Sequence, residues 1–334
     1  MSLSQSLVTG GAGYIGSHMV QRLRAVSHRC VALDSLNRGH SAAVSVIDSL
    51  RSGDAGNVAQ VASLLVDQQV SKVLHFAGLA YVGESFERPL DYYEQNCGVT
   101  TRLVQAMQEA GVTRLVYSSS CATYGVPETL PITEETPQCP VSPYGRSKYF
   151  AEQMLRDAVR AWPELGVVSL RYFNVAGCAR DGSLGEDHRP ETHIIPLLLK
   201  TALGQRDAFT ILGDDYPTPD GTCIRDYVHV EDLCHAHLLA MDAIRPGEFQ
   251  AYNVGLGRGY SVREVIASVE RVTGCSIPLN VEPRRPGDPP ELVCSAEKIR
   301  RELGWEPEIT ELDEIIATAW NWFRAHPHGY DGHP

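Results

Sequence analysis

The first half of the chain alternates short apolar runs with longer stretches in which apolar residues recur every three or four positions. Short apolar runs are typical of buried strands, and a repeat of about 3.6 residues is typical of helices. The predicted strands span residues 5–9, 29–33, 72–77, 113–119 and 167–172, and the predicted helices span 16–26, 58–66, 99–110 and 147–161. This alternation predicts an α/β fold, a doubly wound parallel sheet with helices on both faces.

The pattern loosens after about residue 175. Loops rich in Gly, Pro and Asp occupy residues 177–191, 213–222 and 283–290. Helical spacing persists at residues 195–204, 231–243, 261–273, 296–302 and 311–324. We therefore expect a larger domain over residues 1–175 and a smaller C-terminal α/β domain over residues 176–334, with some later segments returning to the first domain.

The first predicted strand runs into a glycine-rich turn with Gly10, Gly13 and Gly16, which opens a helix. Glycine lets the backbone turn tightly and approach a pyrophosphate, and the helix N-terminus offers free N–H groups. Asp34 ends the second strand, near the position of a carboxylate that binds an adenosine ribose. This favours NAD over NADP, although Arg38 lies nearby and could hold a phosphate. The alternative is a plain glycine turn with an exposed aspartate.

Tyr144 and Lys148 lie one helical turn apart at the start of a predicted helix, so their side chains share one face. Lowering a phenol pKa from about 10 to near 7 requires about 4 kcal/mol. An ammonium about 5 Å away at a dielectric near 20 supplies about 3 kcal/mol. The positive ring of an oxidised nicotinamide could supply the rest, so Tyr144 is a candidate general base. Ser120, at the end of a predicted strand, is placed to hydrogen-bond a reacting oxygen.

Charge and composition exclude several classes of partner. The chain of 334 residues has 29 Lys+Arg against 41 Asp+Glu, a net charge of −12, which argues against nucleic-acid and anionic-membrane binding. It has no apolar stretch near the ~18 residues of a membrane helix, and no signal peptide is visible. The nine cysteines are scattered, which indicates reduced thiols in the cytoplasm. No metal site is expected, because the tail histidines in residues 326–333 are interpreted as a solvated terminus.

Several longer motifs resemble the extended short-chain dehydrogenase/reductase superfamily, and within it the UDP-glucose 4-epimerases, also called UDP-galactose 4-epimerases. The resemblance runs essentially from end to end. The motifs are TGGAGYIGSH (9–18), HFAGLAYVGES (75–85), YSSSCATYG (117–125), SPYGRSK (142–148), LRYFNVAG (170–177), GTCIRDYVHVEDL (221–233), PRRPGD (283–288) and HPHGY (326–330). The resemblance implies a Rossmann-type NAD-binding domain over residues 1–175 and a UDP-sugar-binding domain over residues 176–334. It also implies a cytoplasmic homodimer.

The resemblance also implies roles for individual residues. The catalytic group would be Ser120, Tyr144 and Lys148. Contacts to NAD would come from Gly10, Gly13, Tyr14, Ile15, Gly16, Asp34, Asn37, Asp54, Ala55, Phe76, Ala77, Gly78, Asn96, Ser118, Tyr144, Lys148 and Phe173. Contacts to the UDP-sugar would come from Ser120, Tyr144, Asn174, Ile194, Thr210, Arg225, Arg285, Asp288 and Leu292.

Three positions depart from the family pattern. Ala80 stands where some members have a lysine near the nicotinamide ribose, and Cys97-Gly98-Val99-Thr100 replaces the more usual Val-x-Gly-Thr. Leu292 stands at the gate of the sugar pocket, where a bulky aromatic suits plain hexoses and a small residue admits N-acetylhexosamines. Leucine is intermediate and leaves both substrate classes open.

The implied activity is the interconversion of UDP-galactose and UDP-glucose by transient oxidation at C4, with NAD tightly bound and Tyr144 as general base. An alternative within the class is a UDP-GlcNAc/UDP-GalNAc or other nucleotide-sugar 4-epimerase. A nucleotide-sugar 4,6-dehydratase is disfavoured because Cys121-Ala122, rather than an Asp-Glu pair, follows Ser120. An oxidoreductase that releases NADH is a weaker rival. A non-enzymatic NAD-sensing protein is disfavoured because Tyr144 and Lys148 are both present.

Both expected ligands are anionic although the chain is acidic. The positive charge that holds them must therefore be local. We expect it at the helix end formed by Gly13–Gly16 for one pyrophosphate, and at Arg225 with Arg285 for the other.

Overall fold

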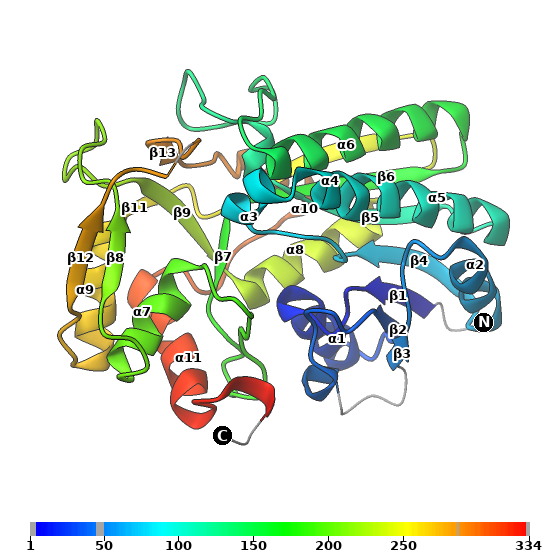
Figure 1. The fold of residues 1–334 in the computed structure, drawn as a ribbon. Coiled ribbons are helices and arrows are strands. Elements are labelled where there is room, and N and C mark those ends of the chain that lie inside the picture. Colours follow the sequence, from blue (N-terminus) through cyan, green and yellow to red (C-terminus); the bar gives the residue numbers. More distant parts are fainter. Residues whose placement is uncertain (1–4, 45–49, 286, 332–334) are drawn as a thin grey trace.

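A seven-stranded parallel sheet forms the larger lobe of the computed structural model, which describes residues 5–44, 50–285 and 287–331 (Figure 1). The order of strands across the sheet is β10-β6-β5-β4-β1-β2-β3, and each neighbouring pair is parallel. The strands are β1 (Gln5–Thr9), β2 (Arg29–Asp34), β3 (Leu50–Ser52), β4 (Val70–His75), β5 (Arg114–Ser120), β6 (Gly166–Tyr172) and β10 (Phe249–Val254). The order runs outward from β1 and β4 in opposite directions, so a crevice opens at their carboxyl ends.

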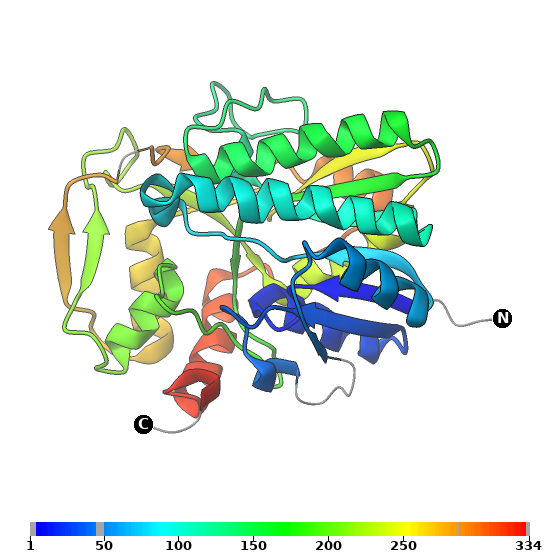
Figure 2. The same ribbon diagram turned by 45° about the vertical axis from the view of Figure 1, so that its right-hand side comes forward.

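Helices cover both faces of this sheet. One face carries α2 (Val58–Asp67), α5 (Val99–Ala110) and α6 (Pro143–Ala161), and the other carries α1 (Tyr14–Ala25), α8 (Val230–Ala243) and α10 (Glu297–Leu303). Figures 1 and 2 show α5 and α6 side by side, with α1 and α8 across the sheet from them. Successive strand residues enter opposite cores, as Leu7 and Val8 do. Burial on both faces explains why these strands are continuous apolar runs.

The smaller lobe combines two short sheets with three helices. Its four-stranded sheet contains β7 (Asn174–Ala176), β9 (Ile224–His229), β11 (Gly259–Ser261) and β13 (Glu291–Leu292), and its second sheet pairs β8 (Phe209–Leu212) with β12 (Leu279–Glu282). The helices are α7 (Ile194–Ala202), α9 (Val262–Thr273) and α11 (Leu312–Ala325). Their apolar faces share one core, which includes Leu198, Val265 and Ile316. Ser261 caps α9 with a reciprocal Ser–Glu capping box, which fixes where this helix begins.

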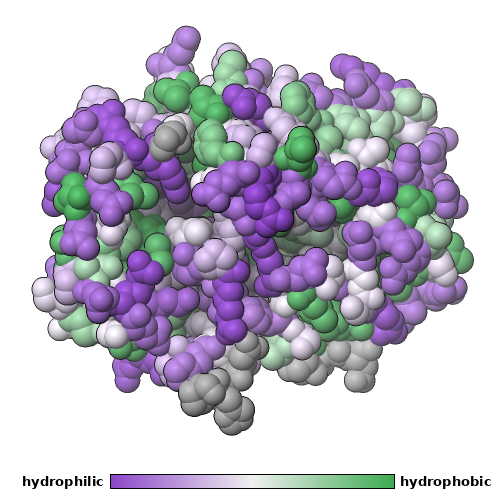
Figure 3. All heavy atoms as spheres, in the orientation of Figure 1, coloured by the Kyte–Doolittle hydropathy of each residue, from purple (hydrophilic) through white to green (hydrophobic). Residues whose placement is uncertain are grey.

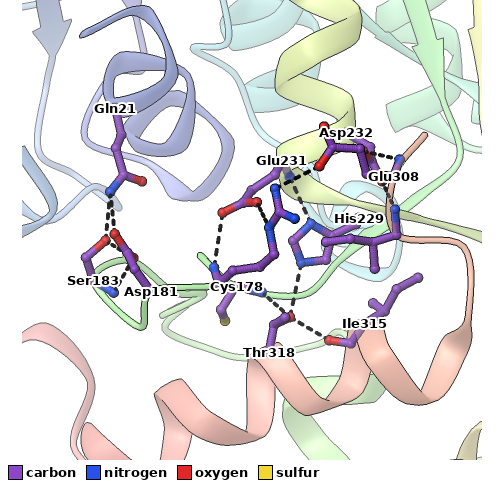
Figure 4. A network of polar contacts seen from close by, with 12 residues as sticks. Gln21, Cys178, Asp181, Ser183, His229, Glu231, Asp232, Glu308, Ile315 and Thr318 are labelled. Carbon is purple, nitrogen blue, oxygen red and sulfur yellow. Dashed lines mark hydrogen bonds and ion pairs between the residues drawn. The ribbon is translucent and has the colours of Figure 1, made fainter. Parts of the chain in front are cut away.

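A polar network joins the two lobes where the segment after β7 passes between α1, α8 and α11 (Figure 4). The Thr318 Oγ1 on α11 contacts Nε2 of His229 at 3.1 Å and accepts a hydrogen bond from the Cys178 N–H at 3.1 Å. The Gln21 amide on α1 donates to Ser183 Oγ at 2.8 Å. These bonds fix the course of the segment that leads into α7.

The structure confirms the predicted fold class, and the main differences lie at short elements. The helix predicted over residues 99–110 coincides with α5. In contrast, α6 begins four residues before the predicted 147, because Ser142 Oγ accepts from the Gly145 N–H and Pro143 occupies the first turn. The short elements not predicted include β3 and the strands of the smaller lobe. The others are η1 (Ser41–Val44), α3 (Val82–Glu87), α4 (Pro89–Tyr92), the π-helical turn η2 (Tyr93–Gly98), η3 (Cys121–Thr123) and η4 (Gly329–Asp331).

The second half of the chain contributes to the larger lobe as well. Strand β10 pairs with β6 along six residues and forms the edge of the large sheet, while α8 and α10 cover one of its faces. The division of the chain at residue 175 stays a prediction. Within the described ranges, no helix combines the length and apolar character needed to cross a membrane.

A buried ion pair on α6 gives a test of the packing around the larger sheet. Arg171 on β6 and Glu152 on α6 form a bidentate pair with distances of 2.6 and 2.9 Å, and their side chains are 2% and 0% exposed. Glu152→Gln leaves the arginine charge buried without its partner, so we expect a loss of about 3–5 kcal/mol of unfolding free energy. Urea unfolding followed by circular dichroism measures this loss.

The exposed pair of Arg160 and Asp157 on the same helix provides the matched control. Asp157→Asn should change the unfolding free energy by less than about 1 kcal/mol, because solvent screens an exposed pair. Equal effects of the two substitutions would contradict the role given to the buried pair.

Candidate active site between the two lobes

A single cavity of about 820 Å³ lies between the carboxyl ends of the large sheet and the smaller lobe. Figure 3 shows hydrophilic residues gathered over the middle of this face, around the hollow between the lobes. The cavity is lined at one end by the β1–α1 turn and the end of β2, and at the other by α7, β8 and β9. The first two turns of α6 lie along its wall with Tyr144 and Lys148. One continuous space therefore connects the predicted cofactor and substrate residues.

The glycine turn leaves no room for side chains. Gly10 has φ +67°, and a Cβ there would lie 2.6 Å from the Ala77 backbone nitrogen. A Cβ at Gly16 would lie 2.0 Å from the Gly10 carbonyl oxygen. Gly13 begins α1 without a side-chain cap, so the N–H groups of the first turn are available to a ligand. This cradle of bare backbone at a helix N-terminus fits the pyrophosphate of NAD.

Asp34 lies at the end of β2 beside this cradle. Its carboxylate accepts hydrogen bonds from the Ala12 N–H at 2.9 Å and the Leu36 N–H at 2.8 Å, which fix its orientation toward the cavity. The Arg38 Nη2 donates to both carboxylate oxygens of Glu84, at 2.7 and 2.9 Å. Arg38 is thus already neutralised, and the site favours the unphosphorylated ribose of NAD over that of NADP.

Most residues predicted to contact the cofactor line the cavity, but two do not. The predicted cofactor residues in the lining are Gly10, Gly13, Tyr14, Ile15, Gly16, Asp34, Asn37, Asp54, Ala55, Phe76, Ala77, Gly78, Tyr144, Lys148 and Phe173. Asn96 is instead buried behind the wall, where it accepts from the Leu79 N–H at 2.7 Å and donates to Ser147 Oγ at 2.9 Å. Ser118 is also buried outside the lining, with its carbonyl accepting from Lys148 Nζ. Both residues hold the wall in place, and the structure does not bring them to the ligand space.

Ser120, Tyr144 and Lys148 come together on the cavity wall from β5 and α6. Ser120 Oγ accepts from the Ala122 N–H at 3.2 Å, and Lys148 Nζ donates to the Ser118 carbonyl at 2.9 Å. Burial raises the pKa of Tyr144 to about 12, and a hydrogen bond with Ser120 opposes this rise. Burial lowers the pKa of Lys148 to about 8, against the charge of Glu152.

These pKa values describe the protein without its cofactor. The sequence predicts a phenol pKa lowered toward 7 by the Lys148 ammonium together with the positive ring of an oxidised nicotinamide. In the protein alone the loss of solvation outweighs nearby charges, so the pKa of Tyr144 rises. A positive charge brought by a bound ligand would lower this pKa.

The opposite end of the cavity carries the predicted substrate residues. The described ones in the lining are Ser120, Tyr144, Asn174, Ile194, Thr210, Arg225, Arg285, Asp288 and Leu292. Arg225 and Arg285 both donate to Asp288, the latter at 2.9 Å, so the three side chains together carry one net positive charge. The expected positive charge is present here, but it is half neutralised and geometrically fixed by the aspartate.

Sequence reasoning missed several residues of the cavity wall. Glu186, His188 and His193 line it, and Glu191 lies behind them. Burial disfavours charged imidazoles, yet the two carboxylates raise the pKa of His188 to about 9 and that of His193 to about 10. A signal was present in the Glu-x-His-x-x-Glu-x-His spacing at residues 186–193, which begins inside the loop 177–191 that was interpreted only as Gly-, Pro- and Asp-rich.

Comparisons with known proteins identify the family of the chain. A family model described as the NAD dependent epimerase/dehydratase family matches residues 6–255. The chain is 46% identical over 330 residues to a UDP-glucose 4-epimerase of Lactobacillus helveticus, covering 97% of this chain and 98% of that protein.

Solved structures resemble it over their full length. A UDP-glucose 4-epimerase of Brucella ovis in complex with NAD has a TM-score of 0.91 and 45% identity, covering 96% of this chain and 98% of that one. A UDP-glucose 4-epimerase of Bifidobacterium longum in complex with NAD⁺ and UDP has a TM-score of 0.93 and 38% identity, covering 98% of this chain and 100% of that one. The chain therefore belongs to the NAD dependent epimerase/dehydratase family, among its UDP-glucose 4-epimerases.

Proposed function

We propose that this protein interconverts UDP-galactose and UDP-glucose by transient oxidation at C4 of the sugar. The observation that carries the proposal is the placement of Ser120, Tyr144 and Lys148 on one cavity, between a dinucleotide cradle and a pair of arginines. The full-length relatives named UDP-glucose 4-epimerase support the same activity.

The cradle and Asp34 would hold NAD at one end of the cavity. NAD bound there supplies a two-electron acceptor, and later donor, for the sugar C4, together with a positive ring charge in its oxidised form. The chain does the rest of the chemistry by moving one proton. Tyr144 accepts the proton of the 4-hydroxyl and later returns it, while Ser120 hydrogen-bonds the same oxygen. Lys148, whose ammonium donates to the Ser118 carbonyl on the same wall, would hold the cofactor and supply positive charge at this wall.

Epimerisation also requires the sugar to present its other face. Arg225, Arg285 and Asp288 would hold the UDP, so the binding energy falls on the nucleotide rather than on the hexose. The wall next to Ser120 is formed by the small side chains of Cys121 and Ala122, which leave space for the ring to turn.

The same wall disfavours a dehydratase. Elimination of water across C5–C6 requires an additional acid and base beside the ketone. Burial raises the pKa of Cys121 to about 12, so its thiol does not serve as either group near neutral pH.

We infer a cytoplasmic homodimer as the working form, with no nucleic-acid or membrane partner. The nine cysteines, all within the described residues, are free, as expected in a reducing compartment. The predicted contact is between α5 and α6 of two copies, and Phe150 on α6 is exposed there. Light scattering of the purified protein measures its mass in solution.

The first prediction concerns the proton carrier. Tyr144→Phe should lower kcat by at least about 100-fold, because it removes the only proton-transfer oxygen assigned to the sugar O4. The variant should still retain NAD, which absorbance after denaturation quantifies. Tyr149→Phe on the same helix is the matched control and should keep its activity. Near-unchanged turnover of Tyr144→Phe would refute the assignment.

The second prediction concerns the reaction type. Purified protein should convert UDP-galactose to UDP-glucose without added NAD, because the cofactor stays bound and is regenerated in each cycle. Proton NMR resolves the two anomeric signals. Accumulation of free NADH would favour an oxidoreductase, and a 4-keto-6-deoxy product would favour a dehydratase.

The third prediction concerns substrate range. Leu292 on β13 lines the cavity and should restrict N-acetylated sugars by its bulk. Leu292→Ala should raise the ratio of UDP-GlcNAc to UDP-galactose turnover by about tenfold or more, the effect of a few methylene groups in a pocket. Equal rates on both substrates in the unsubstituted enzyme would contradict a gating role for Leu292.

A further inference from the structure

A cluster of ligand-type side chains lies outside the proton-transfer group, in the segment that connects β7 to α7. This segment passes between α1 and α7 in Figure 1 and is fastened at its start to α11 through Cys178. It contains Glu186, His188, Glu191 and His193. None of these four residues has a task in the reaction proposed above.

The four side chains converge on one point. One donor atom from each lies within 4.8 Å of the other three. His193 Nδ1 is 2.9 Å from Glu186 Oε1 and 3.0 Å from Glu191 Oε1. His188 Nδ1 is 3.2 Å from Glu186 Oε1 and 3.6 Å from Glu191 Oε2. Two imidazole nitrogens and two carboxylates thus surround a common centre.

Burial and unmade hydrogen bonds distinguish this cluster from a surface group of acids. The Glu186 and Glu191 side chains are each 3% exposed. Among the described residues, His188 Nδ1 and Glu191 Oε2 make only the ion-pair contacts given above and no hydrogen bond, although both atoms are buried. Buried polar atoms without a hydrogen bond are rare in folded proteins, so both atoms point to a ligand between them.

The donor set indicates which ligand this is. Two neutral imidazoles and two carboxylates match the tetrahedral nitrogen and oxygen coordination of Zn²⁺. One divalent cation would also balance the two buried carboxylates in place of the two protons that the imidazoles release on binding it.

Neighbouring groups hold the candidate ligand side chains in place, as a metal site requires. The backbone N–H groups of Thr192 and His193 donate to Glu191 Oε1 at 2.7 and 2.8 Å and orient that carboxylate. The Tyr81 ring lies edge-on to both imidazoles, with centroids 5.8 and 6.0 Å away.

We propose that Glu186, His188, Glu191 and His193 bind one Zn²⁺ ion as a structural site. Four protein ligands complete a tetrahedral shell, so the ion has no open position for substrate. It would lock the chain just before Ile194, where Thr192 and His193 form part of the cavity wall. The sequence predicts no metal site, and the proposal departs from that expectation.

The first test uses the complete protein without an affinity tag. Protein stripped by a chelator is titrated with Zn²⁺ in a calorimeter and then with Co²⁺ in a spectrophotometer. We expect one equivalent of Zn²⁺ per chain, a higher Tm after loading, and visible Co²⁺ bands of tetrahedral intensity. No stoichiometric binding, or a six-coordinate Co²⁺ spectrum, would overturn the proposal and leave two charge-paired Glu–His contacts in its place.

Variants locate the site. The double variant His188→Gln and Glu191→Gln should weaken Zn²⁺ binding by at least about tenfold and abolish the Co²⁺ bands. His328→Ala, which removes an exposed histidine of the C-terminal tail, should leave both unchanged. The reverse result would place the metal on the tail and refute the cluster. Because these measurements follow the metal rather than turnover, their outcome is independent of the epimerase activity.

Discussion

The close approach of the β1–α1 turn to the end of β4 is the constraint on which the rest of the site depends. Gly10 has φ +67°, and a Cβ added to it would lie only 2.6 Å from the Ala77 backbone nitrogen, so this position of the turn must be a glycine. This brings the N-terminus of α1 to the carboxyl edge of the sheet. The same edge carries Asp34, Ser120 and the start of α6, so one local steric requirement sets the distances between cofactor and reacting groups.

Much of the fold and of the candidate site could be predicted from the sequence, because the patterns that indicate them involve residues close together in the chain. The strand, glycine turn and helix of residues 5–26 are adjacent in the chain, and the Tyr144–Lys148 spacing reports one helix face directly. Other features depend on distant partners and carry no local signal. Arg38 is neutralised by Glu84, and Asn96 faces Leu79 and Ser147 instead of the cavity. Such pairings arise only when separate elements pack.

The electrostatics of the cavity also depend on contacts between residues that are distant in the sequence. An acidic chain that binds two anionic ligands needs local positive charge, and the helix end and two arginines supply it. Asp288 takes up half of the arginine charge and in return fixes both guanidinium groups in place. The site therefore has less net positive charge to attract an anion, but its guanidinium donors are held in fixed orientations. Burial likewise raises the pKa of Tyr144, so a positive charge bound beside it would favour proton transfer to the phenolate.

Strand β10 has a consequence for how the chain reaches this state. Residues 249–254 complete the large sheet along β6, long after β6 itself has been synthesised. Until they emerge from the ribosome, β6 presents an unpaired and apolar edge. The nascent chain is therefore exposed to edge-to-edge aggregation during translation of the intervening segments. The large sheet is complete only after residue 254 of the 334 residues has been synthesised.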